Sequence, residues 1–242
     1  MNYQDMLAKQ GAGSAHPGGF AATVEFLSHF PIRRGSRVLE VGCGTGRTAC
    51  YLAGKGCDVT AVDIRPAMLE KARKRAEFER VQVHWVEGDA CALPFAANQF
   101  DVVLLESVTV FVDPERALSE YHRVLRIGGC LHDREMMAVK RFPKKVAEAI
   151  RKLYGVKWVP NLEEWLALLR QADFREVGVW KPTAVPADLA MASDWAYPDP
   201  FLQMDEDLQR DPRFRYMLER NARIMTRYAE YLGYGVFLGT KR

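Results

Sequence analysis

The sequence predicts an α/β fold, a sheet of mainly parallel strands with helices on both faces. Three observations predict it. Short Val- and Leu-rich runs alternate with helical segments, a glycine cluster follows the first run, and an aspartate ends the second. Strands that alternate with helices are typical of βαβ units. Parallel strands covered on both faces have nearly continuous apolar runs, as these do.

The first half of the chain contains five expected strands. In order, the elements are a strand at 37–41, a helix at 46–54, a strand at 58–62, a helix at 66–79, strands at 81–86 and 101–105, a helix at 114–125 and a strand around 131–135. Pro66 stands in the first turn of its helix, where proline is favoured. Gly128 and Gly129 separate the last helix of this half from the strand after it.

The second half is less regular. Its expected elements are a helix at 161–172, a strand at 174–180, a helix at 213–231 and a strand at 234–240. Asn161 followed by Glu163 and Glu164 is a helix start, with an N-cap and acidic residues in the first turn. Prolines at 182, 186, 198, 200 and 212 exclude a long element between 182 and 212. One Rossmann-like domain is expected over 1–242, with a lead at 1–30, a core at 31–181, a cap at 182–232 and a terminal strand at 233–242.

Composition excludes several classes of protein. The 242 residues are 48% hydrophobic and 27% charged, which is globular and not disordered or fibrous. A formal charge of +3 is too small to predict a nucleic-acid partner. No apolar run is long enough for a membrane helix, and no secretory signal is visible at the start. The five cysteines contain no CxxC pair, so reduced thiols, a cytoplasmic location and no metal site are expected.

The strongest chemical signal is the segment Val38–Gly46. Glycines 42, 44 and 46 follow a buried strand and precede a helix. Glycine is needed where backbone must approach a ligand closely, and a helix N-terminus adds N–H donors. The spacing is GxGxG, whereas a dinucleotide site has GxGxxG, which disfavours an NAD-dependent oxidoreductase. The structural alternative is a tight strand-to-helix turn.

Two acidic residues strengthen the case for a nucleoside-containing ligand. Asp63 ends the second strand, where a carboxylate accepts hydrogen bonds from both ribose hydroxyls. Asp89 follows the third strand, where a carboxylate can meet an adenine amino group.

These motifs, in this order, resemble those of the class I S-adenosylmethionine-dependent methyltransferases. The resemblance covers about residues 35–135 and includes the turn Val124–Gly129. It implies a seven-stranded sheet whose last strand is antiparallel, with S-adenosylmethionine along the carboxyl edge and S-adenosylhomocysteine as product. It places Glu40 near the methionyl amine, and Ile64 and Met68 beside the adenine. The residues expected to bind this cofactor are Gly19, Glu40, Gly42, Cys43, Gly44, Gly46, Asp63, Ile64, Met68, Asp89, Ala90 and Glu106.

The flanking segments resemble small-molecule N-methyltransferases, including the phosphoethanolamine group. The likeness lies in the lead, Ala15–Thr23, and in the helix that leads into a Gly- and Tyr-rich final strand. That group has a histidine after its fourth strand, where this chain has Phe111, which disfavours a phosphobase substrate. The resemblance makes Tyr3 a candidate substrate contact.

Strand ends supply the other substrate-side candidates. Glu106 could bind a cationic or amino substrate, or make a hydrogen bond in the cofactor shell. Glu135 ends a strand with four ionisable residues in a row; it is a candidate substrate contact, or part of a buried ion pair with Arg134. His16 could act as a base or hold the substrate, or cap a helix as a loop residue.

Two further features are open to two interpretations. Trp195 and Tyr197 could form a substrate wall or a cation–π cage, or pack locally. The run 140–157 has seven basic residues against Glu148 alone, which is a solvated helix face or a surface that attracts an anionic substrate.

The predicted function is transfer of a methyl group to a small molecule, with an amine as first choice of acceptor and oxygen as second. Catalytic roles are expected for His16, Glu106 and Glu135, with no nucleic-acid or membrane partner and a monomer or homodimer as the assembly. The alternatives are a methyltransferase for tRNA or protein and a cofactor-binding protein without catalysis. The [ND]-P-P-[FYW] motif of nucleic-acid methyltransferases is not present after the fourth strand.

Overall fold

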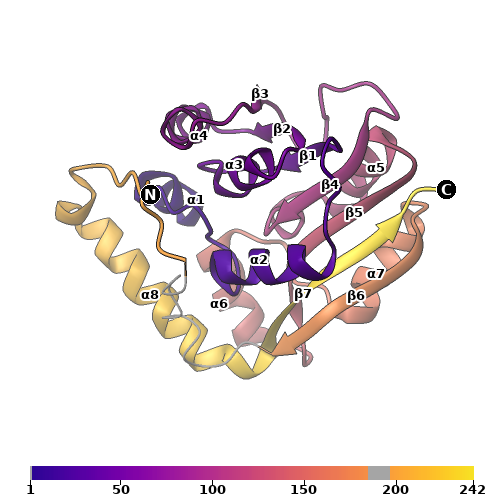
Figure 1. Cartoon of the computed structure of the whole chain (residues 1–242). Coiled ribbons are helices and arrows are strands. Elements are labelled where there is room, and N and C mark those ends of the chain that lie inside the picture. The colour runs from indigo at the N-terminus through magenta and orange to yellow at the C-terminus, as the bar shows by residue number, and fades with distance from the viewer. Residues whose placement is uncertain (1, 185–196) are drawn as a thin grey trace.

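A seven-stranded sheet in the order β3-β2-β1-β4-β5-β7-β6 forms the centre of the computed structural model, which describes residues 2–184 and 197–242 (Figure 1). The strands are β1 (Arg37–Val41), β2 (Asp58–Asp63), β3 (His84–Glu87), β4 (Phe100–Glu106), β5 (Leu125–Ala138), β6 (Arg175–Ala184) and β7 (Leu232–Thr240). β7 is antiparallel to both of its neighbours, and the pairs among β1 to β5 are all parallel. The predicted fold class is therefore confirmed, including the antiparallel last strand.

Helices cover both faces of this sheet. They are α1 (Tyr3–Gln10), α2 (Gly19–His29), α3 (Arg47–Gly54), α4 (Pro66–Glu79), α5 (Pro114–Val124), α6 (Lys144–Tyr154), α7 (Leu162–Gln171) and α8 (Pro212–Tyr228). Pro66 and Asn161 begin α4 and α7 as predicted, the latter with a capping box to Glu164. The basic run around α6 is amphipathic, with Val146, Ile150 and Leu153 buried and its lysines exposed.

Several boundaries differ from the sequence prediction, and three of them have a clear structural basis or consequence. β3 begins at His84 instead of residue 81, because the Val81 N–H is used to close the end of α4 on the Ala76 carbonyl. β5 begins six residues earlier than expected, at Leu125, which pairs with Phe100. β6 continues to Ala184, so the boundary between core and cap at 182 falls inside a strand.

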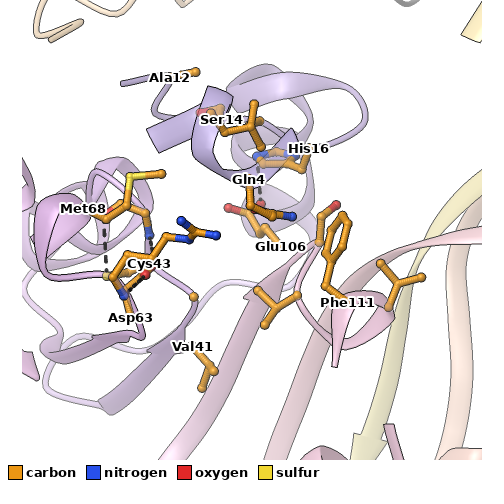
Figure 2. A pocket seen from close by; sticks show the side chains of 18 of the residues that line it. Gln4, Ala12, Ser14, His16, Val41, Cys43, Asp63, Met68, Glu106 and Phe111 are labelled. Atoms are coloured by element: carbon orange, nitrogen blue, oxygen red, sulfur yellow. Dashed lines mark hydrogen bonds and ion pairs between the residues drawn. The ribbon is translucent and has the colours of Figure 1, made fainter. Parts of the chain in front are cut away.

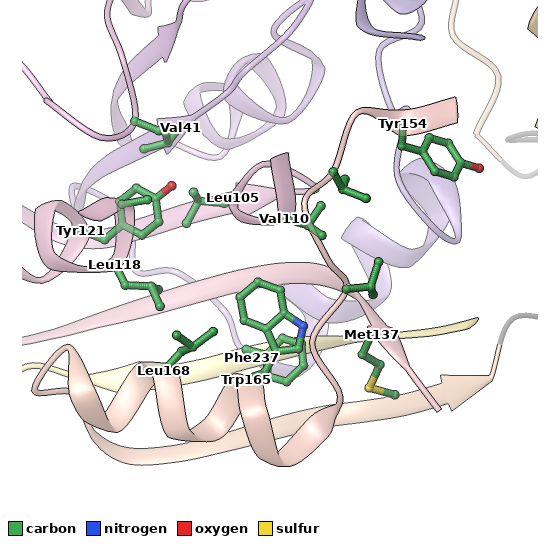
Figure 3. Packing of buried hydrophobic residues seen from close by; sticks show 14 of the residues in the cluster. Val41, Leu105, Val110, Leu118, Tyr121, Met137, Tyr154, Trp165, Leu168 and Phe237 are labelled. Carbon is green, nitrogen blue, oxygen red and sulfur yellow. The ribbon is translucent and has the colours of Figure 1, made fainter. Parts of the chain in front are cut away.

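Alternate residues along the inner strands serve two apolar clusters, one on each face of the sheet. Val38 and Val102 face α2 and α3, whereas Leu39 and Val103 face α5 and α7. On the second face the Trp165 ring lies against Phe237 with centroids 5.2 Å apart, and its indole N–H donates to the Met136 carbonyl (Figure 3). The period of two that every strand imposes thus divides one apolar run between two cores.

The lead folds as two helices, which the sequence analysis treated only as a segment. Asn2 and Asp5 form a capping box at the start of α1, and Gly11 ends it with a left-handed backbone. α2 lies on the sheet, where Phe26 packs against His132 and Trp180. α1 contacts α6 and α8, and Figure 1 shows α1 and α8 side by side, away from the C-terminus.

Two cationic side chains of α4 connect the core to α1 and to the segment that precedes α8. Lys71 Nζ donates to the carbonyls of Ala8 at 2.8 Å and Gln203 at 2.9 Å, and it pairs with Asp205. Arg75, which is 1% exposed, pairs with Asp199 at 2.7 Å. We call residues 3–18 and 197–228 the lid, since α4 links both of these segments to the Rossmann-like core.

Candidate active site

A cavity of about 600 Å³ lies at the carboxyl ends of β1, β2 and β4, beneath the lid. Figure 2 shows Asp63, Cys43 and Met68 on one side of it, Phe111 on the other, and Gln4, His16 and Glu106 between them. We call the first side the cofactor half and the second the acceptor half.

The turn after β1 forms the floor of the cofactor half. Gly42 and Gly44 line the cavity with φ values of 69° and 54°. A Cβ on Gly42 would lie 2.3 Å from the Val108 side chain, so the close approach of the two loops requires glycine. Apart from its chain neighbours, no described residue has an atom within 4 Å of the Cβ position of Gly44, which leaves space above the backbone.

Gly46 is not among the residues that line the cavity, so its expected position beneath the cofactor is not observed. It is the N-cap of α3 with φ 75°, and a Cβ there would lie 2.5 Å from the Trp85 ring. Packing between α3 and β3 explains this glycine. Cys43 lines the cavity, as predicted.

Two carboxylates face the cofactor half. Asp63 accepts hydrogen bonds from the backbone N–H groups of Gly44 and Arg65, both at 2.9 Å, which fixes its orientation at the end of β2. Glu40 is 5% exposed, and its Oε2 has no hydrogen-bond partner within the part of the chain that the structure describes. Burial raises the pKa of both groups, and the charge of Glu106 raises that of Glu40 further. The ionised form of Glu40 would therefore need a cationic partner, such as a ligand ammonium.

The rest of the cofactor half combines apolar walls with one more carboxylate. Ile64 is 61% exposed and Met68 is 8% exposed, and both line the cavity together with Asp89 and Ala90. Gly19, at the start of α2, lines it as well. Apart from Gly46, every residue predicted to bind the cofactor therefore lines one cavity.

Glu106 lies where the two halves meet and is surrounded by protein partners. Its carboxylate accepts hydrogen bonds from Thr23 at 2.5 Å and Thr48 at 2.8 Å. His16 Nε2 lies 3.4 Å and Arg134 Nε 3.6 Å from Oε1. Burial by itself would raise the pKa of this carboxyl, but Arg134, the two hydroxyls and His16 in its protonated form lower it below its usual value. Glu106 is thus held as an anion that positions His16.

Arg134 extends this cluster to the lead, because its guanidinium donates to the Ala22 carbonyl of α2 at 2.8 Å. The sequence analysis named Arg134 only as a possible partner of Glu135, and it did not single out Thr48. The polar run on β5 was the sequence signal for this cluster. Which face of the sheet each residue of the run occupies depends on the pairing of β5 with β4.

Glu135 does not line the cavity, so a contact with substrate is not supported by its position. β4 and β5 pair Glu106 with Arg134, so Glu135 lies one residue further and on the opposite face of the sheet. It is 0% exposed and accepts the backbone N–H groups of Val108 and Thr109 at 2.7 and 2.6 Å. It holds the loop after β4 from behind.

The two aromatic candidates of the cap are not placed in the cavity. Trp195 lies outside the described residues. Tyr197 is 40% exposed and does not line the cavity; its ring lies edge-on to Phe20 with centroids 6.0 Å apart. Its position corresponds to the alternative of local packing.

The acceptor half contains one predicted residue, Tyr3, and several that the sequence analysis missed. Tyr3 packs edge-on against Tyr154 of α6 with centroids 4.7 Å apart, and the Tyr154 hydroxyl donates to Asn221 of α8 at 2.7 Å. The remaining walls are Gln4, Leu7, Val110, Phe111, Val112, Met136 and Met225. No local sequence pattern links α1, α6 and α8, so this group was invisible without the fold.

Comparison with known proteins agrees with this geometry. A model of a methyltransferase domain matches residues 39–132. A Bacillus subtilis (strain 168) protein, the uncharacterized methyltransferase YodH, is 32% identical over 239 residues, which cover 99% of each chain. The chain belongs to the class I S-adenosylmethionine-dependent methyltransferases.

Two further similarities are to methyltransferases that are named for their reactions. The ubiquinone/menaquinone biosynthesis C-methyltransferase UbiE of Ruegeria sp. (strain TM1040) is 36% identical over 56% of this chain and 55% of its own. Phosphoethanolamine N-methyltransferase 2 of Haemonchus contortus, solved with S-adenosyl-L-methionine, has a TM-score of 0.77 at 21% identity. That match covers 98% of this methyltransferase but only 57% of the Haemonchus chain, and it shows the fold. The acceptor atom differs between these two proteins, since one is named a C-methyltransferase and the other an N-methyltransferase.

S-adenosylmethionine is the methyl donor of this methyltransferase, and the cofactor half fits it. The unpartnered Glu40 oxygen suits its ammonium, the oriented Asp63 carboxylate suits ribose hydroxyls, and the Ile64 and Met68 walls suit a flat ring. Across residues 2–184 and 197–242, no group of three or more His, Cys, Asp or Glu side chains could hold a metal ion. Within the same ranges, none of the helices has both the length and the apolar character of a membrane span.

Proposed function

We propose that this methyltransferase transfers the methyl group of S-adenosylmethionine to the nitrogen of a small amine. The observation that carries the proposal is the pair of His16 and Glu106 at the junction between the cofactor half and the acceptor half. An amine enters as an ammonium ion and must lose a proton before it can attack carbon. A carboxylate-supported imidazole beside the reacting centre can accept that proton.

The surroundings of His16 suit this role. The Thr23 hydroxyl donates to Glu106, so its oxygen is left to accept a hydrogen bond from His16 Nε2, 3.3 Å away. A proton on Nε2 would leave Nδ1, which lies 3.4 Å from the Pro17 carbonyl oxygen, as the basic nitrogen of the neutral ring. Once the ring takes up a second proton, the Glu106 charge at 3.4 Å stabilises the imidazolium.

The cofactor supplies a methyl group on a positively charged sulfur, which leaves as a neutral thioether. The protein's own contribution is then alignment and exclusion of water. The lid covers the cavity, and Arg134 and Glu106 tie α2 to the sheet, so His16 stays fixed over the site. His16 first takes a proton from the ammonium ion. The neutral amine nitrogen then forms its bond to the methyl carbon as the carbon–sulfur bond breaks, and the product is a methylated ammonium ion.

A covered cavity also favours a small acceptor over tRNA or protein. Both lid segments are linked to α4 through Lys71 and Arg75. A macromolecular substrate would need these links to open for every turnover. The assay of choice therefore measures the S-adenosylhomocysteine that forms from S-adenosylmethionine in the presence of each of a set of small acceptors.

The test compares primary and secondary amines with alcohols, phenols and thiols of matched size. Amine turnover is expected, and His16→Gln should lower kcat/KM for the best amine at least tenfold while the affinity for S-adenosylhomocysteine is unchanged. The matched control is His29→Gln, because His29 is exposed at the end of α2. Turnover confined to hydroxyl or thiol acceptors, or normal amine turnover by the His16 variant, would overturn the proposal.

A further inference from the structure

The acceptor half contains no lysine or arginine among the described residues that line it. Arg65, the one Lys or Arg on the described cavity wall, lies in the cofactor half, where it pairs with Asp5 at 2.9 Å. The sequence of residues 185–196 contains no lysine or arginine either. Burying a phosphate or carboxylate without a cationic partner is costly. An anionic substrate group therefore has no partner in this half.

Neutral hydrogen-bonding groups take the place of cations. Because the Tyr154 hydroxyl donates to Asn221 Oδ1, the Asn221 NH₂ group is turned to the other side, and no described residue accepts from it. Tyr3 has no hydrogen-bond partner in the described ranges, and burial raises its pKa to about 12, so it stays a neutral donor. Figure 3 shows the Tyr154 ring beyond Val110, with its hydroxyl directed away from the apolar cluster.

Apart from the uncharged amide of Gln4, the rest of this half is apolar. Its walls are the side chains of Leu7, Val110, Phe111, Val112, Met136 and Met225, which come from both lid segments and from the sheet edge. Apolar walls with a few neutral donors favour a hydrophobic ligand that carries an oxygen acceptor, such as a carbonyl, ether or hydroxyl oxygen.

We propose that the acceptor half recognises the uncharged, oxygen-bearing end of a hydrophobic substrate through Tyr3 and Asn221, and that it rejects phosphate and carboxylate groups. The inference rests on the proposed function for the amine at the other end of the substrate. Asn221 is then a specificity-determining residue, and Tyr154 positions it.

The experiment measures binding, by calorimetry, to the enzyme saturated with S-adenosylhomocysteine. The probes are 4-methoxyphenethylamine, the matched acid 4-(2-aminoethyl)benzoate, phosphoethanolamine, and the alcohol 2-(4-methoxyphenyl)ethanol. The methoxy amine is expected to bind at least tenfold more tightly than either anionic probe. Equal or tighter binding of an anionic probe, or no binding of either methoxy probe, would overturn the proposal.

Variants assign the effect to the predicted residues. Asn221→Asp should weaken binding of the methoxy amine about three- to tenfold, which is the effect of losing one neutral hydrogen bond. It should weaken binding of the benzoate by a larger factor. Tyr154→Phe should weaken the methoxy amine less, because the Asn221 amide remains but is no longer oriented. The control is Tyr216→Phe, because Tyr216 is an exposed tyrosine on α8. An unchanged affinity for S-adenosylhomocysteine shows that each variant is folded. Unchanged methoxy-amine binding by Asn221→Asp contradicts the assignment.

The alcohol probe separates this proposal from the amine proposal. If the alcohol binds as well as the matched amine and no amine is methylated, the neutral site stands and N-methylation is wrong. If amines are methylated but the anionic probes bind best, N-methylation stands and the neutral site is wrong.

Discussion

At the scale of single residues, Asp63 shows how backbone orients a binding group before any ligand arrives. Both of its oxygens accept backbone N–H groups, one from the glycine turn and one from the start of α4. A carboxylate held in this way loses little freedom on binding, so its hydrogen bonds to a ligand are retained as affinity.

Asp63→Ala should weaken S-adenosylhomocysteine binding about tenfold or more, because a hydrogen bond to a charged group contributes about 1.5–3 kcal/mol. Calorimetry measures this directly. Asp58→Ala, at the exposed opposite end of β2, is the matched control and should bind normally. Equal affinities for both variants would remove Asp63 from the ribose site.

At the scale of elements, α4 holds the two segments of the lid in place. Lys71 contacts the end of α1 through Ala8 and the segment before α8 through Gln203 and Asp205. These two lid segments are far apart in sequence, so one side chain couples their positions. Because the lid covers the cavity, the cofactor should enter or leave when these contacts open.

Lys71→Met should therefore speed cleavage of the lid by chymotrypsin several-fold, and S-adenosylhomocysteine should slow cleavage in the wild type. The variant keeps most of the aliphatic length of the side chain but cannot donate to the four oxygens that Lys71 contacts, which belong to Ala8, Lys9, Gln203 and Asp205. Lys74→Met, on the same helix and paired only with Glu70 among the described side chains, is the control. Identical digestion of wild type and Lys71→Met would show that the contacts of Lys71 do not hold the lid closed.

At the scale of the whole molecule, buried carboxyl groups give stability an unusual dependence on pH. Asp133 and Glu135 lie on the same face of β5, 1% and 0% exposed, and burial raises the pKa of both. A carboxyl whose pKa is higher in the folded chain stabilises the fold below its unfolded value, and this contribution is lost as pH rises toward its folded value. Glu106, whose pKa is lowered, acts in the opposite direction and loses its contribution only in acid.

Asp133→Asn should gain stability relative to the wild type as pH rises from 5 to 8, by about 1 kcal/mol or more, the value of a one-unit shift. The amide oxygen can still accept the Thr109 hydroxyl, which donates to Asp133 at 2.7 Å. Urea unfolding at the two pH values measures the difference. Asp58→Asn should show no such trend, and a parallel response of Asp133→Asn and wild type would contradict the argument.

The sequence by itself determined the parts of this protein that depend on neighbouring residues. The apolar runs, the proline at the start of α4, the capping box of α7 and the glycine turn are each encoded within a few positions. Asp63 and Asp89 could be predicted to lie at the cavity for the same reason, since Asp63 ends β2 and Asp89 lies just after β3, and parallel strands bring their carboxyl ends to one edge. The family could be inferred because its motifs lie in order along this edge.

Only the tertiary structure decided which polar residues of β4 and β5 face the cavity. A strand turns successive side chains to opposite faces, so the pairing of Glu106 with Arg134 places Glu106 in the site and Glu135 behind it. Tertiary packing also decides the position of Gly46, which lies against the Trp85 ring of β3. The acceptor half depends on the fold most of all. Tyr3, Tyr154 and Asn221 are brought together by packing among α1, α6 and α8, and packing between distant helices leaves no local pattern in a sequence.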